Sequence, residues 1–301
     1  MIQAVETYLA MRRAVGFDLL IADYLLRSFA HFAAGRGETH VRVATAIDWA
    51  SQSATVAQRD ERLKTICRFV RYIRAEDNQH ELPPSGHFSY RKTRRMPHIY
   101  SNAEILLLMD AALQLKPADS LRPHTYQTLI GLLAATGLRV SEALALEYSD
   151  IRSEGLLIRN AKFRKTRLAP LHDTAAAAVE RYLTRRRKMH SNGDQLFIRD
   201  DGRPLLYREV HATFLKLLKM SNLLLPTGRR PRLHEMRHTF AVRALETSPA
   251  GRQRIGQHML ALATYLGHAN IYDTYWYLET TPELLRDIAA AGEAFSCGGQ
   301  S

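Results

Sequence analysis

The residues whose types and spacing suit chemistry lie in the second half of this 301-residue chain. One stretch, YLGHANIYDTYWYLETT (265–281), holds four tyrosines and a histidine, His268, that follows a Leu-Gly pair. A phenol can serve as a nucleophile, but aromatic residues at helical spacing can equally pack into a core. The stretch therefore raises the question of which tyrosine, if any, is a reagent.

Three further stretches hold cationic side chains. Arg139 lies in ATGLRVSE, three residues before Glu142, and Lys162 begins a predicted hairpin turn in AKFRKTRLAPL. His234 and Arg237 lie three residues apart in PRLHEMRH, which places them on one face of a helix. Taken singly, such residues are usually solvated or belong to structural ion pairs, so they are informative only as a set.

The segment HEMRH (234–238) also matches H-E-x-x-H, the zinc-binding helix of metalloproteases. Arg237 lies on the same face as the two histidines, where it would repel the ion. The next histidines, His258 and His268, belong to other elements and supply no obvious third ligand. The sequence therefore predicts no metal site here.

Composition bounds the partners and the location. The chain has 42 Lys and Arg residues against 30 Asp and Glu residues, a net charge of +12. This surplus favours a polyanionic partner, nucleic acid before an anionic membrane, with solubility alone as the alternative. Cys67 and Cys297 lie far apart and indicate neither a disulfide framework nor a cysteine metal site. The chain lacks a signal-peptide pattern and a run long enough to span a bilayer, so we expect a cytoplasmic protein.

Residues 1–80 are expected to be helical throughout, with helices near 2–13, 19–34, 43–53 and 56–75. The fourth helix carries an apolar stripe, Leu63, Ile66, Val70 and Ile73, and a basic stripe, Lys64, Arg68 and Arg71. Because few acids follow Glu61, the basic side chains are expected to lack partners and to follow a phosphate backbone. A solvated helix face is the alternative.

A linker follows over residues 81–100, with three prolines and the basic cluster Arg91, Lys92, Arg94 and Arg95. Prolines and polar residues between helical blocks mark a domain boundary. We therefore expect one domain over 1–80 and a second over 101–301. The basic cluster is expected to lie along a nucleic-acid backbone.

The second domain begins with a capping box, Ser101 and Glu104, ahead of an apolar run. A helix near 121–136 is expected to stop at Gly137, and a shorter one to cover 140–147. The runs GLLIRN, TRLAPLH and QLFIRD are typical of strands, and the chain from about 207 to 293 is typical of helices. The predicted fold is mainly α with a small antiparallel β-sheet near 155–205.

Together these stretches resemble the tyrosine recombinases, or phage integrase family, and in size the Xer-like recombinases, including transposon-encoded ones. The family pattern is an arginine in TGLRxSE, a hairpin lysine, His-x-x-Arg, the LGH histidine and a tyrosine nine residues after it. These positions fall on Arg139, Lys162, His234, Arg237, His268 and Tyr277. The resemblance implies a helical, SAM-like core-binding domain over 1–80 and an α+β catalytic domain over 101–301 with a C-terminal tail helix.

The resemblance also implies the chemistry. Arg139 and Arg237 would hold the non-bridging phosphate oxygens, His234 and His268 would donate further hydrogen bonds, and Tyr277 would attack. Lys162 would protonate the leaving oxygen; the downstream R-L-x-P-L favours it over Lys165, which we expect to contact DNA. Glu142 would hold the arginine array and His238 would pack behind it. The reaction needs no metal, cofactor or ATP.

The implied function is site-specific recombination of double-stranded DNA through a 3′-phosphotyrosine and a Holliday junction, in a homotetramer on paired sites. A topoisomerase IB-like relaxing enzyme and a non-catalytic DNA-binding regulator are the alternatives. The tail TPELLRDIAAAGEAFSC offers Leu284, Leu285 and Ile288 as an apolar face. This face is expected either to dock on a neighbouring subunit or to close its own core.

A helical projection addresses the tyrosines. If 272–278 is helical, Tyr272, Tyr275 and Trp276 share one side, and Tyr277 lies about 200° from Tyr275. We therefore expect the aromatic stripe to be core and Tyr277 to be the reagent, with Tyr275 as its competitor.

Overall fold

The computed structural model describes residues 1–91, 95–161, 165–189, 193–225, 228–247, 255–268, 270, 272–275 and 277. The chain divides into two compact units, Met1–Arg95 and Met96–Ser301, with the division inside the basic segment that follows the helical N-terminus. Among the described residues, no helix combines the length and the apolarity that crossing a membrane requires.

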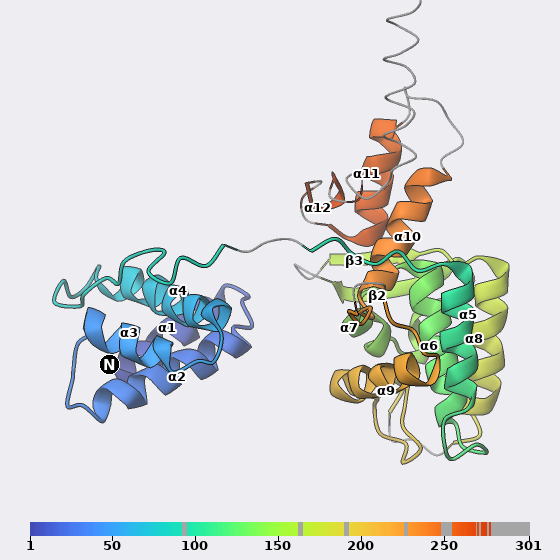
Figure 1. Ribbon diagram of the computed structural model, residues 1–301, viewed down its shortest axis with the longest axis horizontal. Coiled ribbons are helices and arrows are strands. Elements are labelled where there is room, and N and C mark those ends of the chain that lie inside the picture. Colours follow the sequence, from blue (N-terminus) through green and yellow to red (C-terminus); the bar gives the residue numbers. More distant parts are fainter. Residues whose placement is uncertain are drawn as a thin grey trace, which may run out of the picture. The chain divides into compact units, whose positions relative to one another are not determined.

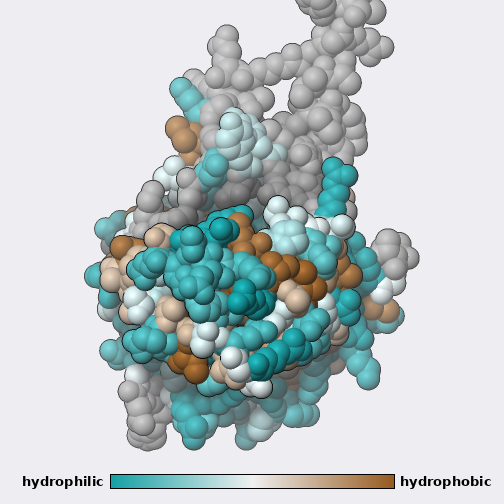
Figure 2. All heavy atoms as spheres, turned by 90° about the vertical axis from the view of Figure 1, so that its left-hand side faces the viewer, coloured by the Kyte–Doolittle hydropathy of each residue, from teal (hydrophilic) through white to brown (hydrophobic). Residues whose placement is uncertain are grey.

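The N-terminal unit consists of four helices, close to the predicted positions: α1 (Ile2–Ala14), α2 (Leu20–Ala34), α3 (Val43–Ser51) and α4 (Val56–Ile73). The Thr55 side chain caps α4 by accepting a hydrogen bond from the Gln58 backbone N. The apolar stripe of α4 is buried against Phe29 and Trp49 in a core of its own. Figure 2 shows one face of this unit, where hydrophilic side chains predominate and hydrophobic ones form small patches.

The second unit is mostly helical. Its helices are α5 (Asn102–Leu113), α6 (Arg122–Thr136), α7 (Val140–Leu144), α8 (Asp173–Arg186), α9 (Tyr207–Met220), α10 (Glu235–Glu246), α11 (Ile255–Leu266) and α12 (Tyr272–Tyr275), with a 3-10 turn at Tyr148–Asp150. The capping box of Ser101 and Glu104 is confirmed, and Gly137 ends α6 with a φ of 61°. Helices α5, α6 and α8 run side by side along one flank of the unit (Figure 1).

The sheet has three antiparallel strands in the order β1 (Ile151–Arg152), β2 (Gly155–Ala161) and β3 (Lys165–Ala169). Strands β2 and β3 form the predicted hairpin, in which Ile158 pairs with Arg167. Gly155 permits the tight turn before β2, because it has a φ of 136° and an added Cβ would lie 2.4 Å from the Ala169 carbonyl oxygen.

The prediction of QLFIRD (195–200) as a strand of this sheet is wrong. Its residues Leu196, Phe197 and Ile198 are all buried in the core, and the segment pairs instead with the chain that follows α7, through Leu196 N and the Leu146 carbonyl. Helix α8 separates it from β3. The fold class, mainly α with a small antiparallel sheet, is confirmed, but the sheet ends at Ala169.

Candidate active site

Arg237 is a buried guanidinium that joins two distant turns. It lies in the first turns of α10 and is only 2% exposed. Its Nη1 donates to the Gly137 carbonyl at 2.7 Å and its Nη2 to the Leu266 carbonyl at 2.6 Å. Burial, followed by the nearby charge of Arg139, lowers the pKa of Arg237 to about 10. The side chain is therefore fixed at the point where α6, α10 and α11 meet.

Glu142 is the acceptor shared by two other arginines. Arg139 donates to it from its backbone N at 2.9 Å and from Nη1 at 2.7 Å, in a capping arrangement at the start of α7. Arg167 donates from Nη1 and Nη2, at 3.1 and 2.8 Å, to the two carboxylate oxygens. Although burial opposes ionisation, these hydrogen bonds lower the pKa of Glu142 to about 2. Glu142 therefore stands as a carboxylate between two guanidiniums.

The C-terminal end of α11 is a second acceptor for the same arginines. The Tyr265 carbonyl accepts from Arg167 Nε at 2.7 Å, and the next two carbonyls, of Leu266 and Gly267, accept from Arg237 and, at 3.5 Å, from Arg139. The last carbonyls of a helix lack partners within it and carry the negative end of its dipole. Three cations consequently collect at one helix end.

Gly267 is required at this helix end. It has a φ of 66°, and an added Cβ would lie 2.9 Å from Arg167 Nη1. The glycine of the LGH stretch thus allows the chain to turn out of α11 against the arginines. The turn delivers His268 beside them.

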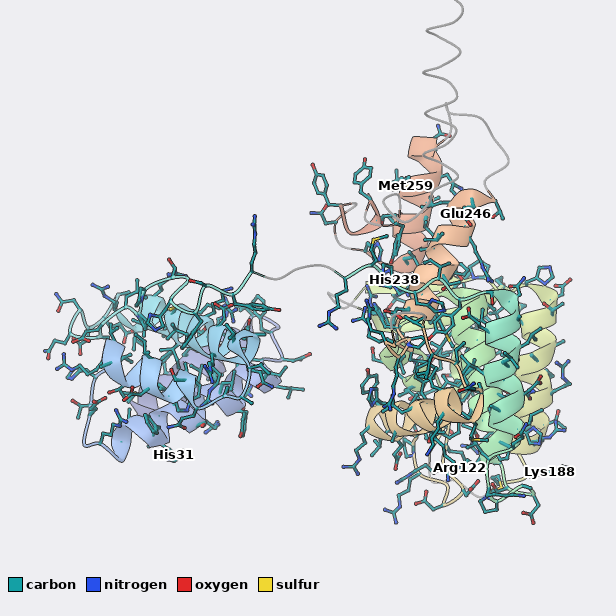
Figure 3. The ribbon with its side chains drawn as sticks, viewed as in Figure 1. His31, Arg122, Lys188, His238, Glu246 and Met259 are labelled. Carbon is teal, nitrogen blue, oxygen red and sulfur yellow. The ribbon has the colours of Figure 1, made fainter. Side chains whose placement is uncertain are left out.

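Three histidines and one tyrosine lie next to the arginines. The ring of His238 contacts the rings of His234 and Tyr277, each at a centroid distance of 5.3 Å. The ring of His268 stacks on Tyr277 at 6.0 Å, and its Nδ1 lies 2.7 Å from Thr274 Oγ1. Figure 3 shows His238 where the N-terminal end of α10 approaches the sheet and α12. The structure thus gathers residues from α10 and from the segment after α11 around Tyr277.

The electrostatics of the site favour the neutral forms of His234 and His238. Burial, then the charges of Arg237 and Arg139, lowers the pKa of His234, even though part of this residue is open to solvent. Burial and the neighbouring His234 lower the pKa of His238 to about 4. The Nδ1 atom of His238 is buried without a hydrogen-bond partner, in keeping with a ring that packs. A neutral histidine can accept a proton near neutral pH, and the imidazolium that forms can return it.

The helical projection of the tyrosines is wrong about which of them are core. Tyr272 and Tyr275 are 72% and 45% exposed, whereas Tyr277 is 3% exposed. The reason is that α12 ends at Tyr275 and that its buried residue is Thr274, the partner of His268. Tyr277 lies in the turn beyond, where its backbone N donates to the Thr274 carbonyl. Trp276 lies outside the described residues.

The roles of the two hairpin lysines remain predictions. Lys162 lies outside the described residues, and Lys165 is described only as the first residue of β3. Arg167, the arginine of the R-L-x-P-L stretch, is not among the predicted site residues, because that stretch is used only to set the hairpin register. A strand arginine has no neighbour at helical spacing, so the R-L-x-P-L stretch itself was the one available signal.

In the H-E-x-x-H segment, Glu235 accepts structural hydrogen bonds and does not act as a general base. Glu235 is fully buried and accepts from the backbone N and the Nε of Arg232, both at 2.8 Å. Among the described residues, the group with metal-ligand geometry is instead His40, Asp77 and His80 in the N-terminal unit. There the Val41 N–H donates to His80 Nδ1, which leaves the proton on the Nε2 that would bind a metal.

Five of the predicted DNA-contacting residues lie on the surface of the N-terminal unit: Lys64, Arg68, Arg71, Arg91 and Arg95. The expectation that the α4 cations lack partners is wrong for two of them, because Lys64 pairs with Asp60 at 2.7 Å and Arg68 with Glu61 at 3.0 Å. These acids precede the cations on the same helix. Arg71, Arg91 and Arg95 are exposed, and Lys92 and Arg94 lie outside the described residues.

Comparisons with known proteins agree with this geometry. The family model described as "Phage integrase family" matches residues 100–283. A putative integrase/recombinase, y4rB, of Sinorhizobium fredii is 36% identical over 296 residues, which cover 95% of this chain and 94% of the relative. The tyrosine recombinase XerD of Oceanobacillus iheyensis is 30% identical over 247 residues, 80% of this chain and 76% of XerD.

Solved structures support the fold. XerH recombinase bound to its difH substrate superimposes with a TM-score of 0.65 at 17% identity, covering 90% of this chain and 78% of XerH. The Tn1549 transposon integrase bound to transposon-end DNA also gives 0.65, at 18% identity, covering 92% and 93% of the two chains. The recombinase relatives favour strand exchange over the topoisomerase-like and regulator alternatives. This chain therefore belongs to the phage integrase family and is a tyrosine recombinase, an enzyme that cuts and rejoins DNA at specific sites.

Proposed function

We propose that Tyr277 is the nucleophile of this recombinase. The supporting observation is that, of the tyrosines described in 265–277, it is the one whose ring contacts both His238 and His268. Its phenolate oxygen forms the new bond to phosphorus as the bond to the 5′ oxygen breaks. The products are a 3′-phosphotyrosine and a free 5′ hydroxyl, so a 5′ hydroxyl from another duplex can reverse the step.

The arginines neutralise the charge that develops on the phosphate. A guanidinium has five N–H donors, and Arg237 uses two of its nitrogens on carbonyls while Arg139 uses Nη1 on Glu142. The remaining N–H groups are available to the non-bridging oxygens, where a preorganised cation lowers the barrier. Burial of Arg237 strengthens this interaction because the local dielectric is low.

The proton transfers fall to the histidines and to Lys162. A phenol has an ordinary pKa near 10, so Tyr277 needs an acceptor for its proton, and we assign this to His234. His268 donates to the phosphate, held in orientation by Thr274. Lys162 on the β2–β3 hairpin protonates the departing 5′ oxygen. Glu142 holds the arginines, and His238 packs between His234 and Tyr277.

The test of this assignment starts from the DNA. Footprinting on the sequences that flank the encoding gene identifies a bound site, and a nicked duplex of that site serves as substrate. In EDTA, the wild-type chain is expected to form a covalent protein–DNA adduct. Tyr277→Phe should bind the duplex normally and form no adduct, while Tyr275→Phe, the matched control, should retain it. An adduct in Tyr277→Phe would overturn the assignment.

We also propose that the enzyme works in the cytoplasm as a homotetramer on two DNA sites, through a Holliday junction, with the tail 282–301 docked on a neighbouring subunit. A groove of about 740 Å³ between α5, α6 and α8 supports this assembly. Its lining includes the apolar residues Leu106, Met109 and Ala178, together with Arg181 and Arg185, which lie one helical turn apart. The tail combines apolar residues with the acids Glu283 and Asp287, and so complements the groove in charge and hydropathy.

A mixing experiment separates docking in trans from docking in cis. A chain truncated after residue 281 and a chain with Arg181→Glu and Arg185→Glu should each fail to form dimers on a single duplex. Mixed together, they should form a heterodimer, because one supplies a tail and the other a groove. Adding Glu283→Arg and Asp287→Arg to the groove variant should restore its own assembly. Neither restoration would occur if the tail closed its own core.

The N-terminal unit is proposed to be the core-binding domain, with residues 81–100 as the linker and 101–301 as the catalytic domain. Four helices around a separate core provide a rigid surface, and Arg71, Arg91 and Arg95 are exposed for backbone phosphates. Phosphate contacts of this kind position a protein on DNA without reading its sequence.

A further inference from the structure

Arg167 is a nearly buried arginine whose donors are directed at protein groups. Its side chain is 11% exposed. Its Nε donates to the Tyr265 carbonyl at 2.7 Å, and its Nη1 and Nη2 donate to the two oxygens of Glu142. Each of its three nitrogens thus has a protein acceptor, unlike Arg139 with its partly open guanidinium. Arg167 is therefore placed to position other groups and not to bind the phosphate itself.

The first group that it positions is Glu142. An arginine that meets a carboxylate through two nitrogens makes the strongest and most directional form of this pair. Because Arg167 occupies both oxygens of Glu142 in this way, Arg139 reaches the carboxylate through one side-chain nitrogen only, Nη1. Without Arg167, the carboxylate would be free to pair with Arg139 through two nitrogens. That pairing would withdraw donors from the phosphate.

The second group is the turn that carries His268. Arg167 Nε binds the last turn of α11 at Tyr265, and its guanidinium lies against Gly267, where an added Cβ would be 2.9 Å from Nη1. The next residue in the chain is His268, which stacks on Tyr277. Arg167 also belongs to β3, which pairs with β2 in the hairpin. One side chain thus connects three elements of the proposed site.

We propose that Arg167 is a positioning residue for strand cleavage: it keeps Glu142 in a two-nitrogen pair, which leaves the outer donors of Arg139 for the scissile phosphate, and it fixes the turn that presents His268. This rests on the roles proposed for Arg139 and His268. The prediction concerns the rate of cleavage and not the affinity for DNA.

The experiment compares Arg167→Gln and Arg167→Lys with the wild-type chain on the nicked duplex of the footprinted site. Under single-turnover conditions with saturating protein, cleavage by Arg167→Gln should fall on the order of 100-fold, since a small misplacement of reacting groups costs about this much. The dissociation constant for the duplex should stay within about two-fold. Arg167→Lys should recover only part of the rate, because an ammonium lacks the planar fork.

One readout distinguishes positioning through Glu142 from a general structural role. The double variant Glu142→Gln, Arg167→Gln should cleave no more than about three-fold slower than the slower single variant, because both changes remove one interaction.

Arg199→Gln provides the matched control. Arg199 pairs with Glu209 at 3.0 Å in the same unit but touches none of the array, so its loss should leave cleavage within about two-fold of wild type. Thermal melting reports whether Arg167→Gln folds; if it does not, Arg167→Lys supplies the same comparisons. Wild-type cleavage by Arg167→Gln, or rate losses that multiply in the double variant, would overturn the proposal. Absence of an adduct with the wild-type chain would instead reject the proposed function.

Discussion

The arginines of the catalytic unit and the cations of α4 in the N-terminal unit have the same charge and opposite environments. Arg237 is 2% exposed and donates to two carbonyls from distant turns, whereas Lys64 and Arg68 are each 52% exposed and pair with acids of their own helix. In the catalytic unit, partners far apart in the sequence fix the direction of each guanidinium. On α4, solvent and neighbouring acids screen the charge.

The difference indicates how each region acts on a phosphodiester. A preorganised cation in a low-dielectric site stabilises charge that develops during reaction. Exposed cations instead release counterions and contribute affinity that depends on salt. Substitutions of the catalytic-unit arginines should therefore alter the rate of cleavage, and substitutions of the α4 cations should alter the affinity for DNA.

The largest effect is expected for Arg237→Lys. An ammonium cannot bind the Gly137 and Leu266 carbonyls and a phosphate together, so single-turnover cleavage should fall by about 10²- to 10³-fold. The control is Arg186→Lys, since Arg186 is equally buried and donates to the Gly193 and Gln195 carbonyls away from the site. Both variants should lose stability, but the control should keep its cleavage rate. Equal losses of cleavage would show that burial alone, and not the site, explains the effect.

A smaller effect concerns stability at acid pH, through Glu142. Its pKa falls from an ordinary 4.5 to about 2 in the folded chain, which corresponds to about 3 kcal/mol of folding free energy. Because the folded pKa is depressed, this contribution is complete above pH 4.5 and is lost as the pH falls towards 2. The free energy of unfolding of wild type minus that of Glu142→Gln should therefore shrink across this window. A difference that stayed constant from pH 6 to pH 3 would contradict the ion-pair network.

The sequence predicts the parts of the site that depend on local spacing. Arg139 and Glu142 lie three residues apart, so a helix start brings them together, and Gly137 and Gly267 mark the turns on which they depend. Arg167 could not be found in this way, because its partners Glu142 and Tyr265 are 25 and 98 residues away. Long-range acceptors of this kind follow from tertiary packing.

The errors over the tyrosines and over QLFIRD share one cause, which is that local periodicity does not report where an element ends or what it packs against. The projection of Tyr272, Tyr275 and Tyr277 assumed a helix that continued past Tyr275, and the hydrogen bond between His268 and Thr274 decides instead which side is buried. QLFIRD has the composition of a strand, but the core covers it on both sides. The apolar composition of QLFIRD therefore predicts its burial correctly, but it does not predict which segment QLFIRD pairs with.

The smallest effect separates the cations within α4 itself. Arg71 is exposed and forms no ion pair within the described part of the chain, whereas Asp60 and Glu61 already neutralise Lys64 and Arg68. If all three meet DNA, Arg71→Gln should reduce the slope of log K against log salt by about 0.9, the value for one phosphate contact. Lys64→Gln and Arg68→Gln should reduce it by less, since each cation must first leave its acid. Fluorescence anisotropy with the footprinted duplex measures these slopes between about 50 and 200 mM salt. Equal slope changes for the three variants would mean that Asp60 and Glu61 do not compete with DNA. The α4 cations would then differ from the catalytic-unit arginines in burial alone.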